Sequence, residues 1–153
     1  KTAAGLRKEL WQREVEVFQG RIERYPKDSH LKFELSKRFI QAKQFPKAIP
    51  LLQQCTADKR LECDVLVLLG ECFINAKNEK LGRRQLEKVV GIVDPIERPD
   101  LFKKAHYVLG RLCEKAGERD QAEEHYNEVI GLNYAYRDAL QRLEKIQGVE
   151  GEE

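Results

Sequence analysis

Three stretches of this chain carry small and large residues in the same order and at the same spacing. In each stretch a small residue directly follows a leucine, and a second small residue stands 12 positions later. Apolar or aromatic residues stand 3, 16 and 19 positions after the first small residue. The first stretch has the small residues Ser36 and Ala48 and the larger residues Phe39, Leu52 and Cys55. The second has Gly70 and Gly82 with Phe73, Leu86 and Val89. The third has Gly110 and Ala122 with Cys113, Tyr126 and Val129. Agreement without gaps indicates three copies of one structural unit.

The residues between these positions predict that each unit is a pair of helices. Apolar residues recur every three or four positions, and no stretch alternates apolar and polar residues as a strand would. Small residues let two helices approach closely, and large residues fill the space beside the contact at native packing density. A single pair cannot bury its apolar face alone, so the units are expected to stack on one another.

The pattern resembles the tetratricopeptide repeat, a helix–turn–helix unit with a period of 34 residues. Ser36 and Gly70 are 34 residues apart, whereas Gly70 and Gly110 are 40 apart, which places six extra residues within 92–100. The first signature tryptophan and the closing proline of the family are both replaced: Lys32, Leu66 and His106 stand at the first position, and Arg60, Asp94 and Tyr134 at the second. The resemblance implies an all-α, right-handed α-solenoid of about three full repeats.

The resemblance also implies one solenoid domain over residues 1–147. We expect a leading helix or partial repeat at 1–25, repeats at 31–64, 65–104 and 105–138, a capping helix at 139–147 and an acidic flexible tail at 148–153. The leading segment carries an apolar stripe that either forms a coiled-coil seam or packs on the first repeat, and its register favours packing. Three turn signals agree: Asp28 as a helix N-cap, Pro46 at a helix start and Gly117 at a helix end.

Motifs that carry chemistry are missing from the sequence. It contains no phosphate-binding glycine loop, no His-Glu-x-x-His and no Gly-x-Ser-x-Gly. His106 and Cys113 are the nearest approach to a metal pair, and two ligands do not make a structural zinc site. The four cysteines form no Cys-x-x-Cys pair and are read as free, buried residues. We therefore expect no enzymatic activity, cofactor, metal or small-molecule substrate.

The charge is unevenly distributed. Residues 1–60 carry 14 basic and 7 acidic side chains, and residues 61–153 carry 14 and 19, which gives +7 and −5. The basic residues form no block, so we favour a solvated surface over a nucleic-acid site. No uncharged stretch approaches the about 20 residues of a spanning helix, so we expect no membrane insertion by this segment. With no signal peptide and no Met in the sequence, we expect a module cut from a larger bacterial or eukaryotic protein. We expect this module to be cytoplasmic, with the alternative that the full-length protein is anchored or exported.

The family resemblance implies a binding groove lined by the first helix of each unit. By position, the groove residues are Phe33, Lys37 and Gln41; Val67, Glu71 and Asn75; and Tyr107, Arg111 and Lys115. The family's clamp for a terminal carboxylate is not reproduced, because Lys37 stands where an Asn and Phe33 where a Lys would be. Core packing for Phe33 and Tyr107, and solvent exposure for the cations, are the alternative interpretations.

The leading hypothesis is a non-enzymatic protein–protein interaction scaffold that binds a peptide or partner helix. The alternative is a structural module that assembles with itself, as a dimer or head to tail. A third hypothesis is that the segment regulates an enzyme encoded beyond it, and these residues offer no test of that hypothesis.

Overall fold

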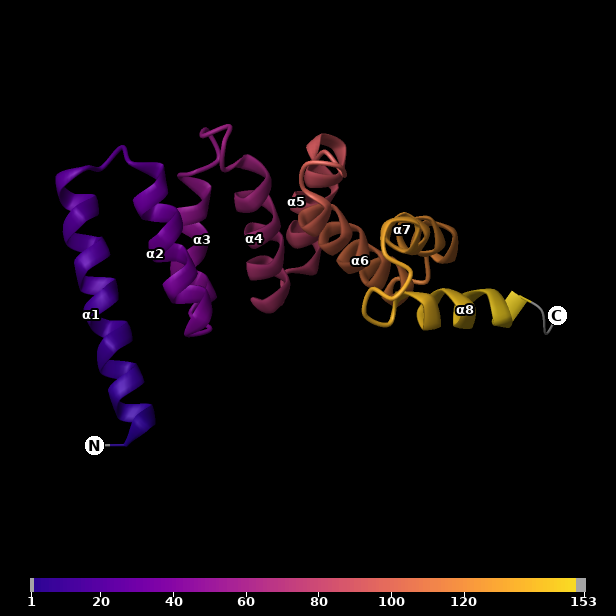
Figure 1. Ribbon diagram of the computed structural model, residues 1–153, viewed down its shortest axis with the longest axis horizontal. Coiled ribbons are helices and arrows are strands. Elements are labelled where there is room, and N and C mark those ends of the chain that lie inside the picture. Colours follow the sequence, from indigo (N-terminus) through magenta and orange to yellow (C-terminus); the bar gives the residue numbers. More distant parts are fainter. Residues whose placement is uncertain (1, 151–153) are drawn as a thin grey trace. The chain divides into compact units, whose positions relative to one another are not determined.

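The computed structural model describes residues 2–150, and within that range the chain forms helices joined by turns (Figure 1). It divides into two compact units, Lys1–Asn78 and Glu79–Glu153. Unit 1 contains α1 (Ala3–Arg24), α2 (Ser29–Gln41), α3 (Phe45–Gln53) and α4 (Glu62–Asn75); unit 2 contains α5 (Glu79–Ile92), α6 (Pro99–Lys115), α7 (Arg119–Leu132) and α8 (Ala139–Glu150). No helix within residues 2–150 has both the length and the apolar composition needed to cross a membrane.

In unit 1, α1 packs on α2 through the apolar stripe seen in the sequence. The indole N–H of Trp11 donates to the carbonyl of Arg38 at 2.7 Å, and its ring meets Phe39 edge-on at 6.1 Å between centroids. Val15 is buried, and Phe18 and Ile22 pack against the same core. The expectation that the leading helix packs on the first repeat is confirmed.

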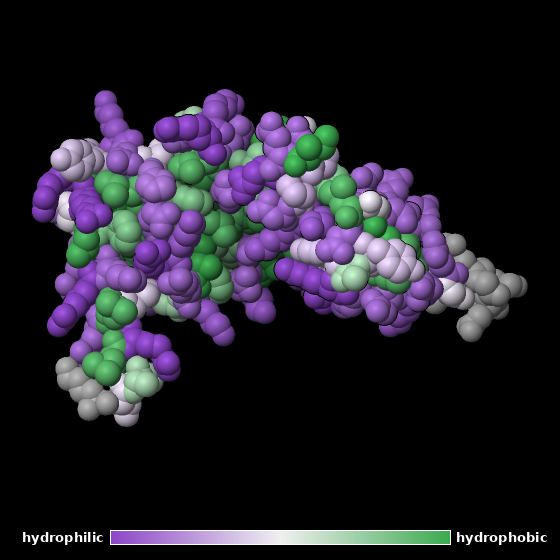
Figure 2. All heavy atoms as spheres, in the orientation of Figure 1, coloured by the Kyte–Doolittle hydropathy of each residue, from purple (hydrophilic) through white to green (hydrophobic). Residues whose placement is uncertain are grey.

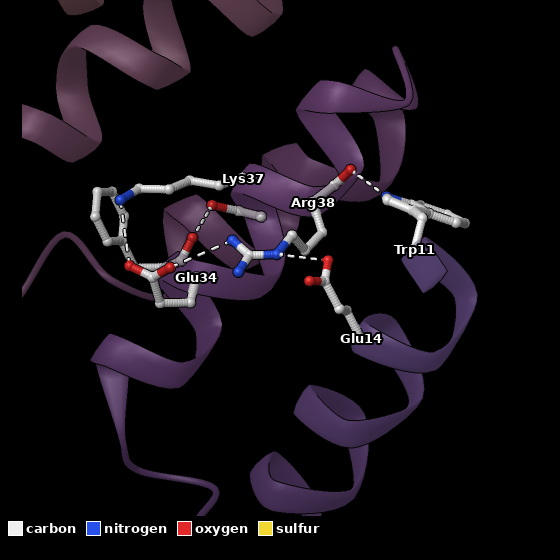
Figure 3. Close-up of polar contacts among 7 residues, drawn as sticks. Trp11, Glu14, Glu34, Lys37 and Arg38 are labelled. Atoms are coloured by element: carbon white, nitrogen blue, oxygen red, sulfur yellow. Dashed lines mark hydrogen bonds and ion pairs between the residues drawn. The ribbon is translucent and has the colours of Figure 1, made fainter. Parts of the chain in front are cut away.

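Charged side chains of α1 and α2 surround this contact. Figure 3 shows the Arg38 guanidinium between Glu14 at 3.3 Å and Glu34 at 3.4 Å. The Lys37 ammonium lies 3.2 Å from the same Glu34 carboxylate. These groups are partly exposed, and ion pairs of this kind contribute at most about 1 kcal/mol. Only the Arg38–Glu14 pair joins the two helices, because both pairs of Glu34 lie within α2.

The turns within the helix pairs share one geometry. Lys43, Lys77 and Gly117 each have a positive φ, at 57°, 67° and 77°. The next N–H in each turn donates to the carbonyl five residues earlier, as in a Schellman motif: Gln44 to Phe39, Asn78 to Phe73 and Glu118 to Cys113, at 2.8, 2.8 and 2.9 Å. Only the third turn has glycine at the left-handed position, where a lysine is strained.

The other predicted helix signals are also confirmed. The Asp28 carboxylate accepts the Leu31 N–H at 3.2 Å as the N-cap of α2. Pro46 stands in the first turn of α3, where its missing N–H leaves no bond unmade.

The small residues of the repeat are buried, as the helix-contact interpretation requires. Ser36, Ala48 and Ala122 have no exposed surface. Gly110 of α6 faces the ring of Tyr126 of α7, and a β-carbon added to it would lie 2.7 Å from Tyr126 Cε1. The contact between α6 and α7 therefore depends on the missing side chain.

Helix boundaries differ from the repeat boundaries expected from the sequence. α4 begins at Glu62 rather than 65 and α6 at Pro99 rather than 105, because the apolar residues Leu61, Leu101 and Phe102 pack into the fold. α8 continues to Glu150, so residues 148–150 are helical although the sequence placed them in the tail; a single exposed Gly148 is too weak a breaker to stop the helix. The rest of the expected tail, residues 151–153, lies outside the described residues.

The six extra residues of the second repeat lengthen helices. α5 has 14 residues against 9 in α3, and α6 has 17 against 14 in α4. The connecting segment 93–98, which contains Pro95, is no longer than its counterpart 54–61. The single-domain assignment over 1–147 stays a prediction.

Candidate functional site

The nine residues predicted to face a partner lie on α2, α4 and α6, at intervals of four residues in each helix. Four residues span about one helical turn, so the three residues in each helix share a face. The first of each set, Phe33, Val67 and Tyr107, is buried, with 6%, 2% and 5% of its surface exposed. Core packing is therefore part of the role of these three residues, and partner contact would fall mainly on their neighbours.

In unit 1 the neighbouring polar groups bond within their own helices. The Lys37 ammonium lies 4.3 Å from the centre of the Phe33 ring. The Asn75 side-chain amide donates to the backbone carbonyl of Glu71 at 2.8 Å. Gln41 is exposed, and Glu71 is half-buried. This face is mixed in charge and offers no single chemistry to a partner.

In unit 2 the face of α6 is more strongly cationic. Arg111 and Lys115 are exposed, and the Lys115 ammonium lies 2.6 Å from the Glu79 carboxylate of α5. Lys103, four residues before Tyr107, extends the same face. Lys103 is not among the groove residues predicted from the sequence, although it stands four positions before Tyr107.

Two residues from the segment between α7 and α8 complete this surface. Tyr136 meets Tyr107 edge-on, with ring centroids 5.7 Å apart. The Arg137 guanidinium lies 5.1 Å from the Tyr107 centroid and 5.3 Å from that of Tyr136, and the Lys103 ammonium lies 5.5 Å from Tyr136. The backbone of Arg137 is in the left-handed region, with a φ of 45°. We call Lys103, Tyr107, Arg111, Tyr136 and Arg137 the tyrosine surface.

A chain of hydrogen bonds beneath the tyrosine surface connects α6, α7 and α8. The Tyr107 hydroxyl donates to the Asp138 carboxylate, which Arg142 also binds at 2.8 Å. Arg142 reaches the Glu114 carboxylate at 3.2 Å, and the Tyr126 hydroxyl donates to the same carboxylate at 2.6 Å. Both carboxylates are thus engaged by groups within unit 2.

The electrostatics of this chain of bonds follow from burial and charge. Burial raises the pKa of Tyr107, and the hydrogen bond to Asp138 raises it further. The same hydrogen bond lowers the pKa of Asp138, with Arg142 adding to the effect. Asp138 is therefore ionised at neutral pH and already paired. Within residues 2–150, no carboxylate forms an ion pair with Lys103, Arg111 or Arg137.

Two histidines of unit 2 meet between α6 and α7. The Nδ1 atoms of His106 and His125 are 2.9 Å apart, and the Phe102 ring packs at a tilt against His106 with centroids 4.4 Å apart. Burial, followed by the neighbouring His125, lowers the pKa of His106 to about 4. Burial, followed by the charge of Arg83, also lowers the pKa of His125. The fold thus brings His106 to His125 rather than to Cys113 as a ligand pair, and the described part of the chain has no cluster of three potential metal ligands.

Three of the four cysteines are unsuited to nucleophilic chemistry. All four are free; Cys55, Cys72 and Cys113 are buried, as expected, whereas Cys63 is half-buried. Burial raises the pKa of Cys72 to about 12, and it also raises the pKa of Cys55 and Cys113. A buried thiol with a raised pKa stays protonated and unreactive.

No family model and no curated protein matches the sequence. Solved structures do match the backbone. A crystal structure of MamA has a TM-score of 0.76 at 17% identity, and the match covers 90% of this chain and 77% of that chain. MamA from residue 41 to its end, from Desulfovibrio magneticus RS-1, has a TM-score of 0.69 at 22% identity, over 88% and 71%.

A third similar structure is the first TPR of Spaghetti (RPAP3) bound to the HSP90 peptide SRMEEVD. Its TM-score is 0.66 at 14% identity, and the match covers 80% of this chain and 93% of that chain. Identities this low establish the fold alone. The chain therefore has the all-α, tetratricopeptide-repeat-like solenoid fold of helix pairs that the family resemblance implied.

Proposed function

We propose that this chain is a non-enzymatic protein–protein interaction module that binds an acidic peptide on the tyrosine surface of unit 2. The observation that carries the proposal is a set of three cations, Lys103, Arg111 and Arg137, around two tyrosine rings, with no ion pair to any of the three in the described chain. Aromatic residues and arginine are the usual energetic anchors of protein interfaces.

The geometry of the surface supports this partner chemistry. The Tyr107 ring is fixed by its hydroxyl bond to Asp138 and by Tyr136 at its edge, so binding would cost little side-chain entropy. The neighbouring acids Asp138 and Glu114 are already engaged, so the cations remain available for carboxylates of a ligand. The similar TPR of Spaghetti is bound to a peptide with acidic residues, which is consistent with this class of ligand.

The test is a binding titration of the intact chain with defined peptides. The probes are SRMEEVD and a version without carboxylates, SRMQQVN with an amidated C-terminus. We expect the acidic probe to bind at least about tenfold more tightly, and its affinity to fall as salt screens the charges. Equal affinities would refute the acidic-peptide proposal.

Charge-reversal variants locate the binding. Arg111→Glu and Arg137→Glu should each weaken binding of the acidic probe, while Lys88→Glu and Lys145→Glu make the same charge change at exposed positions elsewhere in unit 2. All four positions are exposed, so helical content should stay unchanged. Tyr107→Ala is not a clean test, because Tyr107 is 5% exposed and its truncation would cost about 3–5 kcal/mol of stability. If the control variants weaken binding equally, the tyrosine surface is not the site.

Self-assembly is the second candidate function, and the opposite net charges of residues 1–60 and 61–153 favour it. Sedimentation at several protein and salt concentrations distinguishes the two. A monomeric profile throughout would remove self-assembly and leave the peptide-binding proposal in place.

A further inference from the structure

The N-terminal part of α1 extends past the end of α2 and leaves a corner between the two helices. The Trp11 indole is bonded to Arg38 of α2, so the turn of α1 before Trp11 lies level with the end of α2 at Gln41. α1 has 22 residues and α2 has 13, and α1 therefore continues beyond that level. Figure 1 shows this overhang, and Figure 2 shows apolar side chains (green) along it with hydrophilic ones (purple) beside them.

A pocket of about 490 Å³ lies in this corner. The end of α2 and the turn after it form one part of its wall, and the rest comes from Arg7, Lys8, Leu10, Trp11 and Glu14 of α1. Its volume is within the range of small-molecule sites, about 300–1,000 Å³. Residues 7–14 cover only about 10 Å of helix, which suits a molecule of one or two rings better than a partner helix. We call this site the corner pocket.

The apolar part of the wall combines a fixed ring with an exposed side chain. The Trp11 indole is held by its N–H bond to Arg38 at 2.7 Å and by its edge-on contact with Phe39. Leu10, beside it in the sequence, is 60% exposed. Because the indole is already held in place, an apolar group could pack on it with little loss of side-chain entropy.

Cations surround the corner pocket. Arg7 and Lys8 are exposed, and the exposed Lys43 stands between two residues of the wall, Ala42 and Gln44. Within residues 2–150 none of the three cations forms an ion pair. The C-terminal end of α2 carries a negative charge of about half an elementary unit, which the three cations exceed.

The nearby acids do not cancel this positive charge. Glu14, the carboxylate in the wall, is already bound to Arg38 at 3.3 Å (Figure 3). Glu9 does not line the pocket, because it lies about 160° from Trp11 around the axis of α1. The corner pocket therefore combines an apolar wall with a net positive charge.

We infer that the corner pocket binds, without converting it, a small organic anion with an apolar body, such as an aromatic sulfonate or carboxylate. The apolar body would pack on Trp11 and Leu10, and the anionic group would lie towards Arg7 and Lys8. An uncharged compound of the same shape would gain only the apolar contact, and a cation would be repelled. The pocket lies in unit 1, so the inference is independent of the tyrosine surface.

The test uses two fluorescent probes that differ in charge, anilinonaphthalenesulfonate and the uncharged phenylnaphthylamine. Trp11 is the single tryptophan of the chain, so energy transfer from its indole detects probe bound nearby. We expect the sulfonate to bind the intact chain at least about tenfold more tightly, with a difference that shrinks at high salt. Equal affinities would overturn the inference, and so would a lack of energy transfer at about 1 mM sulfonate.

Variants at exposed positions assign the binding to the corner pocket. Arg7→Gln and Lys8→Gln should each weaken the sulfonate at least about threefold and leave the uncharged probe unaffected. Leu10→Gln should weaken both probes without changing the unfolding midpoint, because Leu10 is exposed. Arg13→Gln and Lys27→Gln remove the same charge at exposed positions outside the pocket and should leave both affinities unchanged.

Three results with the variants would also overturn the inference. Equal weakening by Arg13→Gln and Lys27→Gln would mean that the sulfonate responds to the charge of the whole chain. Loss of sulfonate binding in Arg137→Glu would place the probe on the tyrosine surface. A concentration-dependent dimer that Leu10→Gln abolishes would assign the corner pocket to a second copy of the chain.

Discussion

Replacing Gly110 by alanine adds a single methyl group where α6 meets α7. The new β-carbon would lie 2.7 Å from Cε1 of Tyr126 and 3.0 Å from its Cδ1 and Cζ, inside contact distance. Tyr126 has no exposed surface, and its hydroxyl donates to Glu114 at 2.6 Å. The ring can therefore yield only by breaking that bond or by moving α7.

Two opposing effects set the magnitude. Alanine in a helix interior is favoured over glycine by up to about 1 kcal/mol. Overpacking costs about 1–3 kcal/mol, and a lost hydrogen bond about 1 kcal/mol more. The sum is a loss of about 1–3 kcal/mol in the free energy of unfolding. Gly20→Ala in α1 is the control, because nothing lies within 4 Å of its added β-carbon. It should stabilise the chain by about 0.4–1 kcal/mol.

Urea unfolding followed by circular dichroism measures both variants, once a second probe shows that the transition is two-state. A double-mutant cycle with Tyr126→Leu isolates the contact, because the smaller side chain leaves room for the methyl group. A Gly110→Ala variant as stable as the original chain, or one whose cost adds independently to that of Tyr126→Leu, would refute the reasoning.

Three further predictions test other features of the fold. Since burial, followed by His125, lowers the pKa of His106 from 6.5 to about 4, its neutral form supports the fold: that stability is present above pH 6.5 and is lost as the pH falls towards 4. The free energy of unfolding, measured by urea titration at each pH, should fall by about 3 kcal/mol at most. His106→Phe should flatten this pH dependence. An unchanged pH dependence in the variant would show that His106 is not its source. Lys77→Gly relieves the positive φ of 67° and should raise the unfolding midpoint by the equivalent of about 0.5–1 kcal/mol, while the same change at exposed Lys88, in the middle of α5, should lower it. Asp28→Ala removes the cap of α2 and should cost about 1 kcal/mol, whereas Asp28→Asn should cost less than half of that; equal losses would mean that the side-chain oxygen is not the source.

The helix pairs could be predicted because their signal is local and repeated. A close contact between two helices requires small residues such as Gly110 and Ala122, so the contact can be predicted from the sequence. Caps and turns follow the chemistry of single residues, as at Asp28 and Gly117. The lengths of the helices could not be predicted, because apolar residues such as Leu101 and Phe102 extend a helix only once a packing partner is in place.

The candidate sites depend on contacts between residues far apart in the sequence, which no local sequence pattern predicts. Tyr136 and Arg137 lie in a segment between helices, and the fold brings them to Tyr107 from 29 and 30 positions away. His106 and His125 meet for the same reason. The predicted groove residues were assigned by family position, which carries no information about depth. Phe33 and Val67 are buried, and for Phe33 core packing was one of the two interpretations of the sequence.

The hydrogen-bond chain from Tyr107 to Tyr126 bears on how the C-terminal helix opens. Arg142 of α8 supplies the positive charge for two carboxylates, one of them on α6. Fraying α8 alone would leave Glu114 beside the buried Tyr126 without its counter-ion. Terminal helices ordinarily exchange their amide hydrogens early. Here α8 should instead be protected together with α6 and α7, so that the three helices behave as one cooperative foldon.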